Sequence, residues 1–290
     1  MDVLITSLLD LAHEVSDLPE PLLVGGGFGL YLKQRHLEEQ KGIETLISGE
    51  LWPPARATED IDLLLPPEVI ISVEHMKTIR AALDSLGYRP YAPNFQFVKD
   101  TDRGPVKIDL LTCDVPPEHT DKVKINPPRV RPHGDVKLHA YLTSEAIALG
   151  LSPFEMTLGG IRSDGTQSSL LIRIPNPFTY LLMKLHAFHD RMEDERKNLA
   201  AHHALDLYRI VAMLTRDEYD MIKRLAIEYQ DSEAMRRACN IVATEFQSAD
   251  GRGPLRLITG ARETGLRDEH LRIEEFKTSL ADLVGRPDPP

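Results

Sequence analysis

The chain has few of the residues on which several classes of protein depend. Its 290 residues include only two cysteines, Cys113 and Cys239. Two cysteines cannot supply a disulfide framework or a zinc site built on cysteines. No stretch approaches the roughly 18 to 20 apolar residues of a membrane-spanning helix, and the amino terminus, with Asp2 and Asp10, lacks the basic lead of a signal peptide. We therefore expect a protein of the cytoplasm that does not enter a membrane.

Positive charge is also scarce. The chain has 34 Lys and Arg against 45 Asp and Glu, a net charge of −11. A field of this sign repels nucleic acid and anionic membranes, which disfavours a protein that binds duplexes broadly. Segment 122–139 is the exception, because it is clearly basic. It is equally consistent with an exposed hairpin and with a local contact to a nucleic-acid backbone.

The order of the apolar patterns predicts three regions. Residues 1–115 read as a mixed α/β lobe, with helices at 3–17, 28–36 and 69–86 and strands at 22–24, 58–65, 94–99 and 105–112. Residues 38–55 are polar and indicate a loop or lid. Residues 116–176 are interrupted by prolines and indicate a connector of strands and loops. Residues 177–290 have mostly helical periodicity and predict a helical lobe.

Two acids alternate with apolar residues in the strand predicted at 58–65. Side chains alternate with a period of two, so Asp60 and Asp62 leave one face of the strand while Ile61 enters the core. Such a pair alone is most often the solvated face of a strand. Two carboxylates about 4 Å apart, however, repel by ~4 kcal/mol at an effective dielectric constant of 20. Asp109 has the same alternation in the strand at 105–112, and three carboxylates on adjacent strands would suit two Mg²⁺ ions and in-line displacement at phosphorus.

A glycine-rich turn links the first predicted strand to the helix at 28–36. Glycines at Gly25, Gly26 and Gly27 would let the backbone approach a phosphate closely at the start of a helix. Phe28 after the third glycine excludes a Walker A loop, which requires Gly-Lys-Ser/Thr there. Leu30 stands at the sixth position from Gly25, so the Gly-x-Gly-x-x-Gly/Ala fingerprint of dinucleotide-binding proteins is also absent.

These motifs resemble the nucleotidyltransferase superfamily that includes DNA polymerase beta. The resemblance rests on the glycine turn, on Arg56-x-Thr58-x-Asp60-Ile61-Asp62-Leu63, and on Ile108-Asp109-Leu110. Within the superfamily the chain is most similar to the AbiEii-like toxin branch. That branch has a Lys on a later helix, an Arg near the end of that helix and an Asp in an Asp-Leu-Tyr-like stretch. The corresponding residues here are Lys184, Arg191 and Asp206, and the match spans about residues 22–214.

The resemblance implies an α+β fold, a nucleotidyltransferase-like mixed sheet with flanking helices plus a carboxyl-terminal helical lobe. It implies a Mg²⁺-dependent enzyme that moves NMP from an NTP to a hydroxyl. The implied catalytic residues are Asp60, Asp62, Asp109 and Lys184, and the three acids are the ligands of two Mg²⁺ ions. The implied nucleotide-binding residues are Gly25, Gly26, Gly27, Thr58, Arg191 and Asp206. Lys184 and Arg191 lie seven residues apart on one edge of a helix, and His203 is predicted to be packed or hydrogen-bonded.

The acceptor is open at this point. The toxin branch implies the 3′ end of tRNA, with an antitoxin as partner. A small molecule, as in the antibiotic nucleotidyltransferases, and a protein hydroxyl, including that of Thr58, are the other candidates. The alternative from a different class is a non-catalytic regulatory module that binds nucleotides. The presence of all three carboxylates argues against that alternative.

Overall fold

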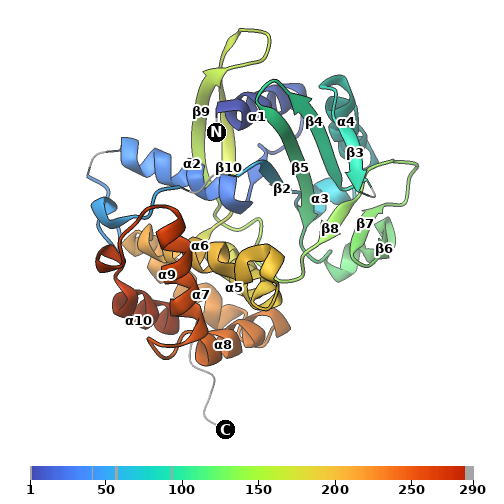
Figure 1. Ribbon diagram of the computed structural model, residues 1–290. Helices are drawn as coiled ribbons and strands as arrows, with labels where there is room; N and C mark the ends of the chain where they lie inside the picture. The colour runs from blue at the N-terminus through green and yellow to red at the C-terminus, as the bar shows by residue number, and fades with distance from the viewer. Residues whose placement is uncertain (1, 41, 56–57, 93, 285–290) are drawn as a thin grey trace. The chain divides into compact units, whose positions relative to one another are not determined.

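The computed structural model describes residues 2–40, 42–55, 58–92 and 94–284. The chain divides into two compact units (Figure 1). The sheet unit comprises Met1–Gly29, Ala57–Ser144 and Leu149–Pro175. The helical unit comprises Leu30–Arg56, Glu145–Ala148 and Asn176–Pro290. The three-part division at 115 and 176 stays a prediction.

The sheet unit is built on one mixed sheet. Among the described residues its strands are β1 (Leu23–Val24), β2 (Asp60–Leu64), β3 (Arg89–Ala92), β4 (Gln96–Thr101), β5 (Gly104–Thr112), β6 (Val123–Asn126), β7 (Arg129–Pro132), β8 (Ala140–Leu142), β9 (Phe154–Ile161) and β10 (Gln167–Ile174). The order is β6-β7-β8-β5-β2-β1-β10-β9, with β4 paired to β5 and β3 to β4. The pairs β1–β10, β2–β5 and β5–β8 are parallel. Strands β2 and β5 thus lie side by side inside the sheet.

Helices α1 (Asp2–Glu14), α3 (Pro67–Ile70) and α4 (Val73–Ser85) accompany this sheet. Helix α1 packs beside β9 and β10, where Thr6 Oγ1 donates a hydrogen bond to the carbonyl of Ile161 (Figure 1). The sequence predicts one helix over 69–86, whereas the structure has two. Ser72 causes the break: its backbone is extended, and its side chain accepts from the amide of His75 to begin α4, as serine commonly does at a helix start.

The helical unit contains α5 (Pro177–Arg191), α6 (Ala201–Ala212), α7 (Arg216–Glu228), α8 (Glu233–Glu245), α9 (Arg252–Glu263) and α10 (Ile273–Val284). It also holds most of α2 (Gly26–Glu39). Short 3-10 turns lie at Gly49–Leu51, Glu195–Ala200 and Asp268–His270, and one in the sheet unit at Pro117–Lys122. Helix α5 begins where the side chain of Asn176 accepts from the amide of Thr179, and α7 begins with a capping box of Thr215 and Glu218. The rings of Phe188, Phe246 and Phe276 lie in the core, where Phe246 is tilted against Phe188 and meets Phe276 edge to face.

The fold class is the one expected: a mixed sheet with flanking helices, followed by helices. The sequence missed β3, because Pro90 within it suggests a loop. Proline is tolerated in this strand since β3 pairs only with β4 among the described residues. The polar segment 38–55 contains one short 3-10 turn, and the amides of Leu46 and Ile47 pair with the carbonyls of Leu214 and Ala212. In the described parts of the chain, no helix has the length and apolar character needed to span a membrane.

Candidate active site

The face of β2 that carries the acids is set by the alternation of the strand. Ile61 and Leu63 are 0% and 1% exposed, while Asp60 and Asp62 on the opposite face are partly exposed. The apolar side chains supply the burial that stabilises the strand. The carboxylates are therefore held on a rigid element at positions that the core determines, as the sequence predicts.

Strand β5 brings the third predicted acid next to the first two. In the parallel β2–β5 pair, Asp109 lies opposite Asp62, and Lys107 lies opposite Asp60. The Lys107 Nζ is 3.5 Å from Asp60 Oδ1, and Gln96 Nε2 on β4 donates a hydrogen bond of 3.1 Å to Asp109 Oδ2. The pairing of Asp62 with Asp109 places two acids directly across from one another on one face of the sheet.

The electrostatics of this face show an excess of negative charge. Burial, followed by the neighbouring charges of Asp62 and Asp60, raises the pKa of Asp109 to about 6, although the Gln96 hydrogen bond acts in the opposite direction. Asp60 Oδ1 is buried and has no hydrogen-bond donor in the described part of the chain; the Lys107 ammonium is an ion-pair partner. Within the described ranges, no three His, Cys, Asp or Glu side chains are arranged as a metal-binding group. The three acids thus share one face of the sheet.

Replacing Asp109 with Asn is expected to stabilise the metal-free protein at pH 7. A carboxyl whose pKa rises from 3.8 to about 6 on folding lowers the free energy of unfolding progressively between those pH values. The change should therefore add on the order of 2 to 3 kcal/mol at pH 7, and the Gln96 hydrogen bond can remain. Urea unfolding in EDTA measures the gain, which should fall to about 1 kcal/mol at pH 4.5 and be largely lost at about pH 3.5, below the unfolded-state pKa of 3.8. If Asp109→Asn were less stable than the wild type at pH 7, burial and the repulsion of Asp109 by Asp62 and Asp60 would not destabilise the folded protein.

The glycine turn lies directly against Asp62. The amide of Gly25 donates a hydrogen bond of 2.8 Å to the carbonyl of Asp62, so it takes part in strand pairing. Gly26 has a φ of +61°, and a Cβ built there would lie 1.7 Å from Asp62 Oδ2. Glycine is required at position 26 both by the left-handed backbone and by the closeness of the carboxylate. The glycine turn therefore packs directly against Asp62, and a change in one displaces the other.

A Gly26→Ala change is expected to disturb the site more than the fold. The left-handed backbone costs an alanine roughly 1 to 2 kcal/mol, and its methyl must displace the Asp62 carboxylate, which can lower activity about 100-fold for a shift near 1 Å. Gly165→Ala is the matched control, because Gly165 has a φ of +85° and a Cβ added there would meet nothing within 4 Å. Nucleotidyl transfer and urea unfolding should be measured for both. If Gly26→Ala and Gly165→Ala lost activity equally, backbone strain alone, and not displacement of the Asp62 carboxylate, would explain the loss.

Thr58 lies at the start of this region. Its Oγ1 is 3.4 Å from the amide nitrogen of Asp60 and accepts a hydrogen bond from it. Arg56, the first residue of the motif, lies outside the described residues. The hydroxyl of Thr58 is thus a local support for the backbone that carries Asp60.

The helical unit holds the other predicted residues, and Lys184 is not the edge cation that the sequence suggests. It is 7% exposed on α5, and its Nζ lies 2.7 Å from Oδ2 of Asp206 on α6, which is 0% exposed. Asp206 Oδ1 also lies 3.3 Å from Nη1 of Arg209. The fully buried Arg209 donates through Nε and Nη2 to Oε1 of Gln34 on α2. Asp206 thus holds Lys184 inside a buried network.

Sequence reasoning missed Arg209 and Gln34. Arg209 follows Asp206 by three residues on one helix, and such spacing places two side chains on one face, so the sequence could have indicated their contact. No sequence pattern could have indicated Gln34, since it lies 175 residues from Arg209 in the chain. Arg191 hydrogen-bonds His203 Nε2 through Nη1 at 2.8 Å, and this confirms that His203 is packed and hydrogen-bonded.

Comparison with known proteins now decides the family. A family model described as "Nucleotidyl transferase AbiEii toxin, Type IV TA system" matches residues 11–290. The chain belongs to the AbiEii family. It is accordingly a nucleotidyltransferase of a toxin–antitoxin family.

No curated protein is significantly similar to the chain. Among solved structures, the chain is similar to the solution structure of the antibiotic-resistance factor ANT(2″)-Ia, described as having substrate-regulated conformation dynamics. The identity is 13%, with 79% of this chain and 98% of that chain covered and a TM-score of 0.34. A TM-score this low does not establish a common arrangement of elements.

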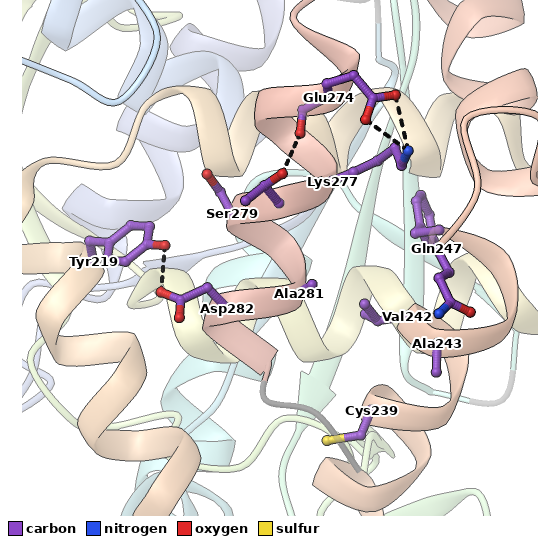
Figure 2. Close-up of a pocket in the computed structure, with 12 residues that line it drawn as sticks. Tyr219, Cys239, Val242, Ala243, Gln247, Glu274, Lys277, Ser279, Ala281 and Asp282 are labelled. Carbon is purple, nitrogen blue, oxygen red and sulfur yellow. Dashed lines mark hydrogen bonds and ion pairs between the residues drawn. The ribbon is translucent and has the colours of Figure 1, made fainter. Parts of the chain in front are cut away.

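A large cavity of this AbiEii-family protein lies elsewhere in the helical unit. It has a volume of about 1100 Å³ and is bordered by residues of α7, α8 and α10 (Figure 2). The charged groups that Figure 2 shows around it are paired with their neighbours: Tyr219 with Asp282, and Lys277 with Glu274. It contains none of the predicted site residues. Its size therefore does not make it the nucleotide site.

The basic segment 122–139 forms a hairpin. Strands β6 and β7 pair in register from Val123 with Pro132 to Asn126 with Arg129. Lys124 and Lys137 are exposed, while Arg131 is half-buried and donates to the carbonyl of Gly134. The segment is thus an exposed hairpin whose lysines contact solvent, and the contact to a nucleic-acid backbone stays a prediction.

Proposed function

We propose that this AbiEii-family protein transfers NMP from an NTP, with Mg²⁺, to the 3′ end of a tRNA. The observation that supports the chemistry most strongly is the register of Asp62 with Asp109, beside a glycine turn that leaves no room for a Cβ at Gly26. Nucleotidyl transfer is the activity of the family. The metal, the acceptor and the role of each residue are the proposal.

The acidic face fits a divalent cation. Its three acids offer carboxylate oxygens, the ligands that Mg²⁺ prefers, beside the ammonium of Lys107 and the amide of Gln96. Among the described residues the buried Asp60 Oδ1 has no hydrogen-bond donor, and the pKa of Asp109 is raised first by burial and then by the charges of Asp62 and Asp60. Asp60, Asp62 and Asp109 would hold two Mg²⁺ ions, which supply charge stabilisation to the triphosphate and to the attacking oxygen.

The chain's own groups would bind and orient the nucleotide. The turn at Gly26 and Gly27 lets a phosphate approach the backbone at the start of α2, whereas Gly25 pairs with Asp62. Lys184 and Arg191 stabilise the negative charge of the phosphates, the main contribution a protein makes to phosphoryl transfer. Asp206 keeps Lys184 in place. The acceptor hydroxyl forms a bond to the α-phosphorus, pyrophosphate leaves, and Asp109 helps to take up the hydroxyl proton.

The choice of tRNA as acceptor rests on the toxin family and on the basic hairpin. A net charge of −11 disfavours broad nucleic-acid binding, but the exposed lysines of β6 and its surroundings can contact one strand end electrostatically. An antitoxin would be the partner of such a toxin, and the cytoplasm its location. The hydroxyl of Thr58 is the candidate acceptor for self-modification.

Incubation with each labelled NTP and Mg²⁺, with and without total tRNA, tests the proposal, with Asp60→Ala as control. Label on tRNA supports it, and label on the protein alone would replace tRNA with self-modification. Label on neither, with NTP still bound, would favour a regulatory module or a small-molecule acceptor. Failure of both NTP and Mg²⁺ to raise the melting temperature would overturn the assignment of the site, since a ligand specific for the folded state must stabilise it.

A further inference from the structure

Two side-chain pairs connect α5 and α6 in the helical unit. Lys184 on α5 contacts Asp206 on α6, and Arg191 on α5 contacts His203 on α6. The later α5 residue meets the earlier α6 residue, so the two helices run in opposite directions. His203 and Asp206 are three residues apart and share a face of α6. The histidine therefore lies near both cations.

The pairing with Arg191 determines which nitrogen of His203 carries the proton. A guanidinium has only donors, so Nε2, 2.8 Å from Arg191 Nη1, must accept. The imidazole is then neutral, with its proton on Nδ1. Burial, followed by the positive charges of Lys184, His202 and Arg191, lowers the pKa of His203 well below its ordinary value, which agrees with the neutral form.

Among the residues that the structure describes, none accepts from the Nδ1–H group of His203. The side chain is 6% exposed, and Nδ1 is buried. Nearly all buried polar groups in proteins are hydrogen-bonded, so such an atom indicates a missing partner. Because the group is a donor, the partner must bring a lone pair.

The charges around His203 indicate the kind of acceptor. Lys184 and Arg191 contribute two positive charges around His203, and Asp206 contributes one negative charge. An anion with several acceptor oxygens would balance the charge and accept from Nδ1–H at the same time. A phosphate group has both properties, and an amine or a carbonyl compound does not.

We propose that His203 binds a phosphate of the NTP through Nδ1–H, beside Lys184 and Arg191, with Arg191 holding the required tautomer. This inference rests on the proposed function, since it assigns a further binding residue to the same nucleotide. It gives Arg191 two tasks, to bind phosphate and to orient His203.

Two substitutions separate the donor from the contact with Arg191. In His203→Gln the side-chain oxygen can reach the place of Nε2 and accept from Arg191, but no donor remains at the place of Nδ1. In His203→Asn the amide nitrogen occupies the place of Nδ1 and donates, but the side chain is too short for Arg191. His270→Gln is a control for the residue type, because His270 is exposed and belongs to neither pair.

Binding of inorganic tripolyphosphate to the full chain, measured by calorimetry, and the KM for NTP are the readouts. Loss of a hydrogen bond to a charged phosphate should weaken both roughly 10- to 100-fold in His203→Gln, with a smaller change in kcat. His203→Asn should remain within a few-fold of the wild type, as should His270→Gln. In the wild type, tripolyphosphate should shift the NMR signal of the His203 Nδ1 proton, a readout independent of how the variants fold.

The inference is overturned if His203→Gln binds tripolyphosphate like the wild type, if both His203 variants lose binding equally, or if the wild type does not bind it. These outcomes differ from failure of the proposed function. A wild type that transfers label to an acceptor while His203→Gln binds normally overturns only the role of His203. A wild type that binds tripolyphosphate through His203 but transfers no label overturns only the proposed transfer.

Discussion

Replacing Asp62 with Asn is expected to lower the rate of nucleotidyl transfer by about 1000-fold. Asp62 is the acid that lies both opposite Asp109 and against Gly26. The substitution preserves size and shape but removes one unit of negative charge where the proposed metal ions and the triphosphate meet. A loss of several kcal/mol of transition-state stabilisation is typical for metal-assisted catalysis, and about 4 kcal/mol corresponds to three powers of ten.

Transfer of labelled nucleotide measures this effect, with Asp100→Asn as the matched control. Asp100 lies on β4 of the same sheet, but its carboxylate is exposed and pairs with Arg89. The control should retain wild-type activity. Asp62→Asn should also unfold at a urea concentration no lower than that of the wild type, since it relieves repulsion with Asp109. If it retained more than about a tenth of the activity, equivalent to a loss under 1.4 kcal/mol, Asp62 would not act at the reacting centre.

Replacing Asp206 with Ala is expected to cause the largest loss of stability. The change leaves Lys184 and Arg209 buried without their shared carboxylate. Removing one partner of a buried ion pair typically lowers the free energy of unfolding by about 3 to 5 kcal/mol, because an uncompensated charge remains. Gln34 still accepts from Arg209, but it carries no charge and cannot replace the carboxylate.

Asp282→Ala is the control for the loss of an ion pair as such. Asp282 pairs with Lys223, both side chains are nearly half exposed, and Asp282 also accepts from Tyr219, so the expected cost is about 1 to 2 kcal/mol. Urea unfolding of the two variants gives the comparison. Equal costs would mean that Asp206 is better solvated than its burial indicates. The double change Asp206→Ala with Lys184→Met should recover part of the loss, since it removes one of the stranded charges.

The acids on the sheet could be predicted because the pattern that identifies them lies in consecutive residues. The alternation of Asp60 and Asp62 with Ile61 is written in consecutive residues, and the same holds for the strand of Asp109. What the sequence did not contain was the register, which needs the pairing of Leu63 with Leu110 and their neighbours in a packed sheet. The alternation of the acids suggested that the two strands are adjacent, and the resemblance to a family strengthened that expectation.

The helical half could be predicted only in part. The helical stripe of α5 identified Lys184 as an edge residue, but burial depends on α6 packing against that edge. Asp206 is 22 residues away and Gln34 is 175 residues from Arg209. No local pattern encodes such contacts. The break at Ser72 was missed for the opposite reason: a capping serine is a local signal, but the apolar spacing on both sides of it favoured one long helix.

The closeness of Gly26 to Asp62 has a genetic consequence. Every amino acid other than glycine adds a Cβ, which would lie 1.7 Å from the carboxylate oxygen, so no substitution at this codon is conservative. In cells that survive only by inactivating the expressed toxin, escape mutations should accumulate at codon 26 across all replacement types. Codon 165, where φ is also positive but an added Cβ would meet nothing within 4 Å, should gather few such mutations, and sequencing of survivors would reveal the difference.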